Sequence, residues 1–481
     1  MARKTVSLLS QESLEKIHKE SLKILENIGI QVDNPRCQSI LEKAGAKRIG
    51  QSDIMRLPSQ MVMEAMGQIS KEFELVHPLG KRITIPGNEV LVGTRVKMPK
   101  VLDYGASECR APKRQDVINL CHIHNNLPKA SIALAIQHPC ADVPLAIDVA
   151  DTLGLVFSIT GNVNIVATGN VEDTRVSLDI AQLAVGSDNT DQDPGLFVEV
   201  NTTSPLKHGN REGDIFLHVT ERHIPIDTGP MPISGVATPF TLAGTLAVSN
   251  AEQLYLCTLA NLVWPGAKVI HAVTGSIMNM QAANLSMGGA ETCLLSSAEI
   301  ALAKYYGLST SRMGGYTDSY YPDIQAGIEK TAALLMLAQS GADIIAAGGP
   351  LSCAAHHSYE QVVIDYDIWE MCERIATEIE VNDDTLAYQT VAEVGPGGSF
   401  MVSQHTMDWV RSEEHYYGGS FNRTLLQGEE KTMLSRARER VQSILQRPVE
   451  YRAPQDAIKL IKQYVCDYAK EKKVDQPEWT V

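Results

Sequence analysis

The feature that most constrains the fold is a regular alternation of short β-prone runs with helical patterns from residue 131 onward. The starts of the runs are 27 to 46 residues apart, and helical patterns such as 323–339 and 359–378 fill the gaps. Strands that alternate with helices predict a parallel sheet. Eight such units over about 280 residues predict a closed (β/α)8 barrel, and a doubly wound open sheet is the alternative. The runs are Ile132–Gln137, Val163–Thr168, Leu196–Val200, His223–Asp227, Val269–Val273, Ser311–Gly315, Asp343–Gly348 and Gln389–Val394.

The residues on either side of this alternation have other patterns. Residues 11–28 form an amphipathic helix that Gly29 can end, and Pro58 opens a further helix. Three short β-prone segments follow, at 73–77, 82–86 and 89–93, and two amphipathic helices begin after residue 427. We therefore expect three parts: an N-terminal helical and β-hairpin region over 1–130, the barrel over 131–426, and a C-terminal helical extension over 427–481.

Composition and charge exclude several classes of protein. The 481 residues are 44% hydrophobic and 21% charged, which is typical of a globular chain. The formal net charge of −15 disfavours binding to nucleic acid or to an anionic membrane surface. The N-terminus lacks the apolar core of a signal peptide, and no stretch approaches the ~18 apolar residues of a membrane helix. The nine cysteines include no CxxC pair, which favours free thiols in a reducing compartment, so we expect a cytoplasmic protein.

In a (β/α)8 barrel the chemistry gathers at the C-terminal ends of the strands. Here these positions are rich in Gly, Thr and Asn and poor in paired carboxylates. Arg312 is the only Lys or Arg inside a predicted strand, which suggests either recognition of a carboxylate or phosphate or a structural ion pair. The tyrosines that follow it, Tyr316, Tyr320 and Tyr321, offer aromatic faces to a cation, or simply loop contacts.

Signals for a metal or nucleotide are weak. The stretch Gly395–Gly398 is GPGG rather than GxGxxG, and tight-turn chemistry explains it better than anion binding. HExxH is absent, and the local cluster Cys121–His124 ends an apolar helix, so we expect no metal site. His356 and His405 follow predicted strands and are open to a functional role.

Several segments, in order along almost the whole chain, carry a resemblance to a known family. The chain resembles the trimethylamine methyltransferase superfamily of corrinoid-dependent enzymes, in its branch without pyrrolysine. The resembling segments are LKILENIGIQV near the N-terminus, PCADVP at 139–144, NTTSPL at 201–206, MPISGVATPFTLAG at 231–244, DSYYPDIQAGIEK at 318–330, EVGPGGSF at 393–400, and His405-Thr406.

The resemblance implies a (β/α)8 barrel that moves a methyl group from an amine to the Co(I) corrinoid of a separate carrier protein. Every position is a standard residue, so the chain has no pyrrolysine. The resemblance therefore implies a substrate other than trimethylamine, namely a quaternary amine such as glycine betaine, proline betaine, carnitine or γ-butyrobetaine. Because Co(I) is the nucleophile, no catalytic side chain beyond substrate positioning is implied. No cofactor tightly bound to this chain is implied either, and a homo-oligomer is expected.

The substrate-binding residues follow from predicted barrel position rather than from a family motif. We expect Arg312 to bind the betaine carboxylate, with His356 as a second donor. The tyrosines expected to face the ammonium group are Tyr104, Tyr316 and Tyr320. Weaker candidates for the substrate pocket are Asn201 and His271. A non-catalytic betaine-binding protein and a different barrel enzyme that acts on an anionic substrate are the alternatives.

Overall fold

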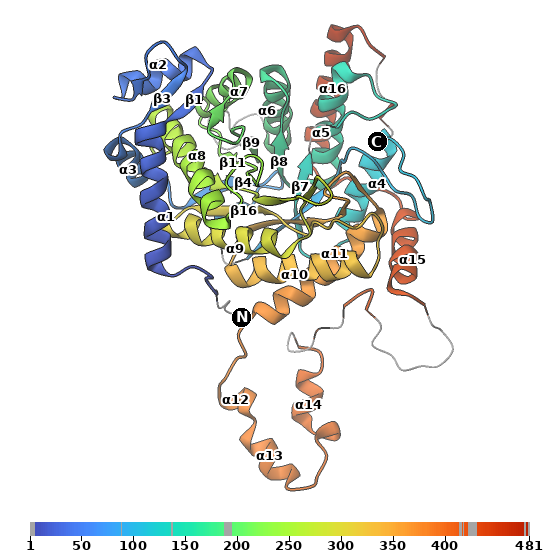
Figure 1. The fold of residues 1–481 in the computed structure, drawn as a ribbon. Helices are drawn as coiled ribbons and strands as arrows, with labels where there is room; N and C mark the ends of the chain where they lie inside the picture. Colours follow the sequence, from blue (N-terminus) through green and yellow to red (C-terminus); the bar gives the residue numbers. More distant parts are fainter. Residues whose placement is uncertain are drawn as a thin grey trace.

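The computed structural model contains a closed barrel of eight parallel strands (Figure 1). It describes residues 5–87, 89–135, 138–186, 195–412, 416, 418–421, 431–475 and 478–479. The strands follow one another around the barrel in the order β11-β13-β16-β17-β6-β7-β8-β9. Their bounds are β6 Leu91–Arg95, β7 Ala130–Ala135, β8 Val163–Ala167, β9 Leu196–Val200, β11 Ile226–Thr228, β13 Val269–His271, β16 Ser309–Met313 and β17 Ile344–Gly348. The predicted (β/α)8 fold is confirmed.

Eight helices surround the barrel, one after each strand in the sequence. Side-chain caps fix where several of them begin: the side chains of Asn170, Asp323 and Ser358 accept backbone N–H groups of the first turn. Gly161 and Gly341 end two helices in the left-handed conformation. The helices are α4 Arg114–Asn125, α5 Asp148–Thr160, α6 Val171–Val185, α7 Asn210–Thr220, α8 Leu242–Val263, α9 Ala290–Tyr305, α10 Ile324–Ser340 and α11 Tyr359–Ala376.

One of the eight predicted strands is wrong. The run Gln389–Val394 lies in a helix, α13 (Tyr388–Val394), outside the barrel. The missing barrel strand is β6, which the sequence pattern placed in the N-terminal hairpin region. Strand β6 closes the barrel because it pairs with β7 on one side and with β17 on the other, far away in sequence. The last two residues of the first predicted strand, Ile136 and Gln137, lie outside the described residues.

A hairpin fills the N-terminal end of the barrel. Its strands are β4 (Phe73–Val76) and β5 (Arg82–Ile85). Phe73, Leu75 and Ile85 pack in one buried cluster with side chains of the barrel strands, among them Ile132 and Phe197. The opposite, C-terminal end of the barrel is therefore the end that is open to chemistry.

The terminal regions pack outside the ring of helices. In the N-terminal region a π-helix, η1 (Ile24–Ile28), ends at Gly29, and β1 then pairs with β10 from the loop after β9. At the other terminus, α15 packs on α11 and α4, and α16 packs on α5 and α6. The elements are α1 Gln11–Lys23, β1 Ile30–Val32, α2 Pro35–Lys43, β2 Lys47–Arg48, β3 Ile54–Arg56, α3 Ser59–Gln68, β10 Lys207–His208, α15 Met433–Leu445 and α16 Gln455–Lys472.

Short elements decorate the loops that follow barrel strands. One is a 3-10 turn, and the others form two small sheets. They are η2 Leu145–Ile147, the sheet of β12 Ile233–Ser234, β14 Ser276–Asn279 and β15 Asn284–Ser286, and the sheet of β18 Pro350–Leu351 and β19 His356–His357. No helix among the described residues is long and apolar enough to cross a membrane.

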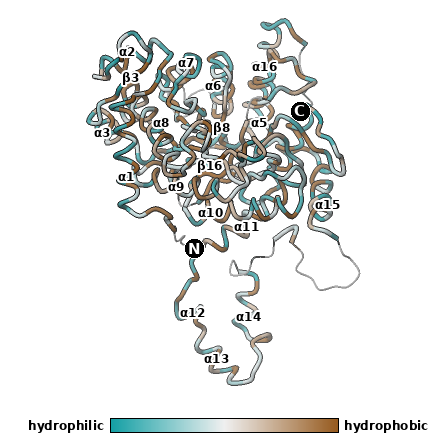
Figure 2. Tube along the Cα trace, viewed as in Figure 1, coloured by the Kyte–Doolittle hydropathy of each residue, from teal (hydrophilic) through white to brown (hydrophobic). Residues whose placement is uncertain are grey.

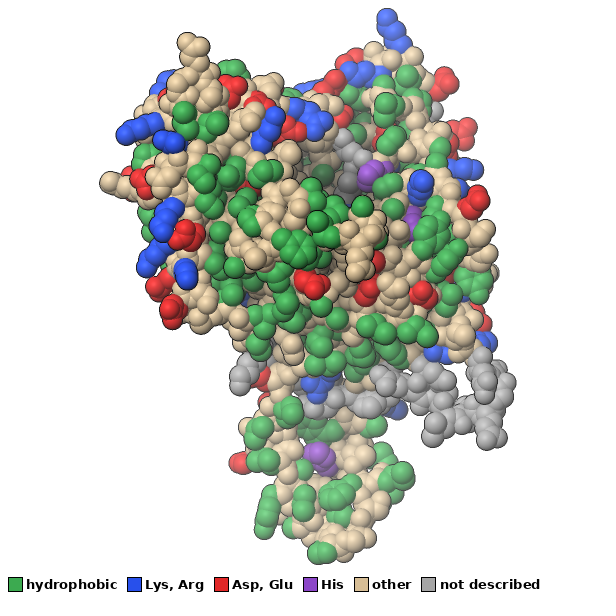
Figure 3. All heavy atoms as spheres, in the orientation of Figure 1, with side chains coloured by type: hydrophobic (Ala, Val, Ile, Leu, Met, Phe, Trp, Pro, Cys, Tyr) green, Lys and Arg blue, Asp and Glu red, His purple; other side chains and the backbone are tan. Residues whose placement is uncertain are grey.

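A segment after α11 projects away from the barrel (Figure 1). It carries α12 (Asp383–Leu386), α13, η3 (Phe400–Val402) and α14 (Gln404–Trp409). Hydrophobic stretches occur in this segment as well as in the barrel (Figure 2), and hydrophobic side chains lie on its surface (Figure 3). We call residues 377–412 the arm.

Candidate functional site

The alternation of side chains along each strand decides which residues face the inside of the barrel. In β16 and β17, Met313, Ile344 and Ala346 pack in the inner cluster, whereas Ile345 packs in the outer cluster under the helices. Arg312 pairs in register with Ile345. Because successive side chains point to opposite faces, Arg312 faces the helices and Met313 faces the lumen.

Arg95, at the end of β6, lies on the lumen side. It pairs in register with Leu134, a member of the inner cluster. Its Nη2 donates a hydrogen bond to the hydroxyl of Tyr316, and its guanidinium carbon lies 5.4 Å from the centroid of that ring. It also contacts the sulfur of Met313. Among the described residues no carboxylate forms an ion pair with Arg95, so its charge is open to an anionic ligand.

Two carboxylates lie on the far side of the lumen from Arg95. Glu199 of β9 and Asp227 of β11 are neighbours in register, and β11 lies four strands from β6 in the closed barrel. Asn201 links Glu199 to the backbone after β11: its Nδ2 donates to Glu199 (2.8 Å) and its Oδ1 accepts from the N–H of Gly229 (2.8 Å). Burial, followed by the charge of Glu199, holds the pKa of Asp227 well above its usual range.

Tyr316 lies within the electrostatic reach of both sides. Burial raises the pKa of its hydroxyl; the charge of Arg95 opposes this shift and the charge of Glu199 adds to it. The ring is 5% exposed. The lumen thus has a basic side at β6, an acidic side at β9 and β11, and a tyrosine between them. We call Arg95, Glu199, Asn201, Asp227 and Tyr316 the lumen cluster.

Lys97, two residues after Arg95, forms a buried ion pair with Asp148. Lys97 donates hydrogen bonds to Asp148 and to Thr152 (2.8 Å), and Asp148 accepts the backbone N–H of Cys140. Burial, followed by the charges of Lys97 and Arg95, lowers the pKa of His138. His138 therefore favours its neutral form beside these cations.

Arg312 and His271 lie on the other side of the barrel wall from the lumen. The Nη1 of Arg312 donates to the backbone carbonyl of His271 (2.6 Å), and its Nη2 lies 3.0 Å from His271 Nδ1. His271 Nε2 in turn lies 3.6 Å from a carboxylate oxygen of Glu299 on α9. Burial lowers the pKa of Arg312 to about 10, and the charge of Glu299 opposes that shift. The structure thus places Arg312, which was expected to bind the carboxylate, on the helix side of the barrel wall, where its hydrogen bonds go to backbone carbonyls and to the His271 ring.

Three more of the expected residues lie in loops and make contacts of their own. His356 of β19 is buried, with Nε2 2.8 Å from the backbone oxygen of Tyr320, and the Tyr320 hydroxyl meets Cys109 Sγ at 3.2 Å. The guanidinium carbon of Arg438 lies over the ring of Tyr104, 5.0 Å from the ring centroid. Among the described residues, none of these contacts involves the lumen cluster.

Of the seven residues expected from the sequence, the structure thus brings Tyr316 and Asn201 to the lumen. Sequence reasoning missed Arg95, Glu199 and Asp227. A signal existed for two of them, since Glu199 lies inside one predicted strand and Asp227 ends another. Within the described residues, no group of three or more His, Cys, Asp and Glu side chains is arranged to hold a metal ion.

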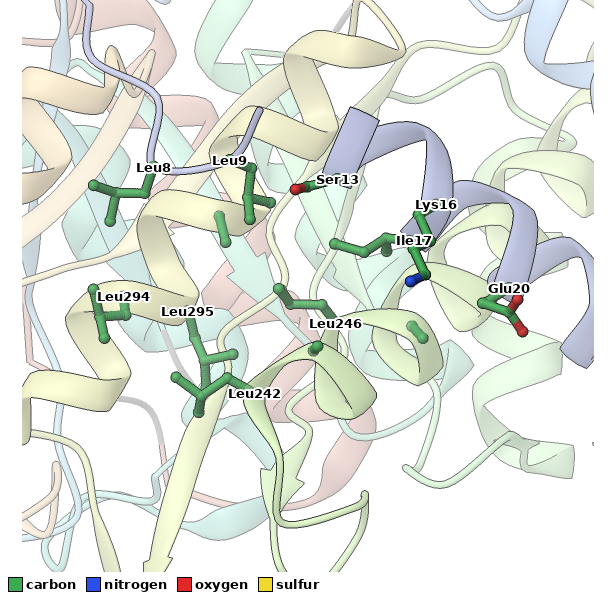
Figure 4. Close-up of a pocket in the computed structure, with 13 residues that line it drawn as sticks. Leu8, Leu9, Ser13, Lys16, Ile17, Glu20, Leu242, Leu246, Leu294 and Leu295 are labelled. Atoms are coloured by element: carbon green, nitrogen blue, oxygen red, sulfur yellow. The ribbon is translucent and has the colours of Figure 1, made fainter. Parts of the chain in front are cut away.

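An apolar cavity outside the barrel makes a useful contrast with the lumen. It measures about 460 Å³ and lies between α1, α8 and α9 (Figure 4). Leucines line most of it, including Leu9, Leu242, Leu246 and Leu295, with Lys16 and Glu20 at its edge. It lacks the separated opposite charges of the lumen cluster, which is therefore the candidate functional site.

Comparison with known proteins places this barrel in a family. A family model described as trimethylamine methyltransferase (MTTB) matches residues 2–474. The chain belongs to the trimethylamine methyltransferase family. This family member is 29% identical over 421 residues to trimethylamine methyltransferase MttB of Methanosarcina barkeri (strain Fusaro / DSM 804), covering 84% of the chain and 83% of the relative.

Two further comparisons bear on this MTTB family member. It is 26% identical over 406 residues to a glycine betaine methyltransferase of Desulfitobacterium hafniense (strain Y51), covering 83% of the chain and 84% of that protein. The solved monomethylamine methyltransferase of Methanosarcina barkeri superposes with a TM-score of 0.50 at 12% identity, over 92% of the chain and 96% of that structure. At this identity the structural likeness shows the barrel fold alone.

Proposed function

We propose that this protein transfers a methyl group from a betaine-type quaternary amine to the Co(I) corrinoid of a separate carrier protein. The observation that carries the substrate class is the separation of charge across the lumen. A betaine has a carboxylate at one end and a quaternary ammonium at the other. Arg95 offers a guanidinium to the first, and Glu199 with the ring of Tyr316 offers a carboxylate and an aromatic face to the second.

The chemistry asks for positioning rather than for a protein nucleophile. The bond between the methyl carbon and nitrogen breaks, its electron pair stays on nitrogen as a neutral tertiary amine, and the methyl group passes to Co(I). No proton has to move in this step. The task of the side chains is to hold the methyl group in line with the incoming corrinoid and to exclude water.

The buried state of Asp227 fits this task. A site that binds the cation too strongly would slow the reaction, because the ammonium loses its charge in the transition state. Burial and the charge of Glu199 raise the pKa of Asp227, which favours its neutral form and reduces the negative charge on this side of the lumen. The site then attracts the ammonium without overstabilising it.

The corrinoid is a substrate that the carrier must bring to the barrel mouth. Exposed hydrophobic side chains follow several barrel strands on loops at this end, and they suit a protein surface better than water. They are Leu145 after β7, Met231, Val236 and Phe240 after β11, Met280 after β13, and Tyr321 after β16. We propose these loops as the contact surface for the carrier.

The test is a spectral assay under anaerobic conditions. The protein is mixed with reduced cob(I)alamin and, in separate reactions, glycine betaine, proline betaine, carnitine, γ-butyrobetaine, choline and trimethylamine. Loss of the Co(I) absorption with one or more betaines is the expected result. Choline, which has the ammonium but no carboxylate, serves as the matched negative substrate.

Three outcomes would contradict the proposal. No methyl transfer from any betaine, by folded protein that is also supplied with a corrinoid carrier, would reject it. Tight betaine binding without transfer in the same samples would instead support a non-catalytic binding protein. Transfer from trimethylamine alone would reject the betaine class while keeping the methyl transfer.

A further inference from the structure

The arm, residues 377–412, has no core of its own. None of its residues is buried, and none of its four short helices contributes a buried side chain. Many of its side chains are nevertheless large and apolar. The most exposed are Ile379 (78%), Val381 (71%), Leu386 (61%), Tyr388 (75%), Met401 (78%) and Val402 (80%).

The arm is nevertheless locally ordered by hydrogen bonds. Asn382 and Thr385 form a reciprocal cap at the start of α12, and the side chains of Ser399 and Ser403 cap η3 and α14. Helices of four to seven residues gain too little from their own hydrogen bonds to be stable in water. A contiguous apolar surface of this kind marks a protein contact.

A complementary surface lies on the barrel of the same chain. Its exposed residues are on the outer sides of α10 and α11, where Ile324 is 83% exposed, Ile328 65% and Ile375 53%. Beside them runs an apolar groove of about 730 Å³, which also includes Ile364, Ile368, Met371, Phe421 and Met433. We call this surface the α10–α11 face. Figure 3 shows hydrophobic side chains over the barrel next to the arm as well as on the arm itself.

We propose that two copies of this chain exchange arms, each arm docking on the α10–α11 face of the other copy. Both halves of the contact are present on one chain, so a two-fold axis makes the interface self-complementary. At about 100 Å² for each of these exposed apolar side chains, two arms and two faces hide roughly 1,800 Å², which is the size of a stable interface.

The position of the arm argues against the corrinoid carrier as its occupant. In a (β/α)8 barrel each helix runs back from the mouth, so the C-terminal end of a helix lies at the opposite end of the barrel. The arm begins directly after Ala376, the last residue of α11. A carrier that presents a corrinoid to the mouth approaches the end of the barrel opposite to the root of the arm.

Sedimentation velocity of the full chain across micromolar to tens of micromolar concentrations tests this exchange. Wild type is expected to be dimeric or a larger assembly built from dimers. Met401→Asp on the arm and Ile328→Asp on the α10–α11 face are each expected to weaken the dimer at least tenfold. Leu460→Asp on α16 is the matched control, since Leu460 is an apolar side chain that is 48% exposed elsewhere. Circular dichroism checks that each variant is folded, and Ile324→Asp replaces Ile328→Asp if that variant is not.

A mixing experiment separates exchange from other ways to dimerise. The arm variant retains an intact face, and the face variant retains an intact arm. Equal amounts of Met401→Asp and Ile328→Asp are therefore expected to form a heterodimer that holds one intact contact, although neither variant dimerises alone. A monomeric wild type, or a dimer that neither substitution weakens, overturns the proposal. If both variants are monomeric and the mixture stays monomeric, the arm does not bind this face and the proposal also fails.

Discussion

Two arginines near the C-terminal end of the barrel have the same charge and opposite surroundings. Arg95 points into the lumen, where a tyrosine hydroxyl accepts its hydrogen bond. Arg312 points to the helices, where the carbonyl of His271 accepts its hydrogen bond and Glu299 balances its charge. Arg95 is therefore free to serve a ligand, and Arg312 is committed to the fold.

Replacement of Arg95 should act on substrates that carry a carboxylate. Arg95→Met removes the charged donor, and a charge-assisted hydrogen bond contributes about 1.5–3 kcal/mol, so KM for a betaine should rise roughly 10- to 100-fold. The activity toward a quaternary amine without a carboxylate, however low, should change little. Steady-state kinetics with cob(I)alamin measure both.

The control for this substitution is Arg312→Met. Because it leaves Glu299 and His271 buried without their cation, it should lower the melting temperature and leave the ratio of betaine to choline activity unchanged. If Arg312→Met raises the betaine KM selectively and Arg95→Met does not, the assignment of the carboxylate to Arg95 is wrong.

A buried histidine should make the fold sensitive to acid. His208 Nδ1 lies 2.8 Å from the Tyr255 hydroxyl, and burial lowers the pKa of His208 to about 4. The unfolded chain has an ordinary histidine pKa near 6.5, so it binds the proton first as the pH falls. The contribution of this histidine to the free energy of unfolding is fully present above about pH 6.5 and is lost as the pH falls toward 4. Between pH 7 and pH 5 the loss is about 2 kcal/mol.

The measurement is urea unfolding of wild type and His208→Gln at both pH values. Glutamine does not titrate, so the variant should lose less stability than wild type on going from pH 7 to pH 5. An equal loss in the two proteins would show that His208 does not carry the effect. The substitution itself can lower the free energy of unfolding at pH 7, but the comparison uses only the change of each protein between pH 7 and pH 5.

At the scale of elements, the sequence predicts the closed barrel but misidentifies one of its eight strands. Seven of the eight barrel strands coincide with predicted runs, because each is a short β-prone run between helical patterns. The eighth run, Gln389–Val394, is equally compatible with a helix and forms one. Strand β6 follows a hairpin without an intervening helix, and its pairing with β17 joins residues about 250 positions apart. No local pattern carries that information.

The same limit explains which part of the site was predictable. Barrel strands are buried on both faces, so the sequence does not tell which of two neighbouring residues faces the lumen. Arg312 and Met313 are such a pair: the expectation placed Arg312 at the lumen, and the structure places Met313 there. Tyr316 and Asn201 lie in the segments after strands, where the position at the mouth follows from order along the chain alone.

The junction between the first helix and strand β1 depends on a glycine. Gly29 has a φ of +90°, and a Cβ there would lie 2.6 Å from the carbonyl oxygen of Met55. Gly29→Ala should therefore lower the free energy of unfolding by about 1–3 kcal/mol. Gly67→Ala is the control: this glycine lies in α3, a Cβ meets nothing within 4 Å, and alanine should stabilise the helix by about 0.5–1 kcal/mol.

Thermal melts of both alanine variants test this prediction. A fall in melting temperature for Gly29→Ala, together with an unchanged or raised value for Gly67→Ala, is the expected pattern. Equal changes in the two variants would mean that the backbone at Gly29 is not a constraint on the fold.

At the scale of the whole molecule, the lumen cluster and the root of the arm lie at opposite ends of the barrel. The lumen cluster lies at the ends of β6, β9 and β11 and draws all its residues from one chain. The arm leaves from the far end of α11. The α10–α11 face begins at Ile324, the first residue of α10, so a docked arm lies on the outside of the barrel and adds no residue to the lumen cluster.

Because the lumen cluster draws all its residues from one chain, we predict that a dissociated monomer is still active. Met401→Asp should give a monomer whose kcat and KM with cob(I)alamin and a betaine lie within about twofold of wild type, because substitutions far from a site act independently of it. Its melting temperature should fall and lose its dependence on protein concentration, since association stabilises the folded state by mass action. The two readings are taken on the same preparation. A monomer that has lost activity while remaining folded would mean that the partner copy completes the site, and the lumen cluster of one chain would then be an incomplete description of it.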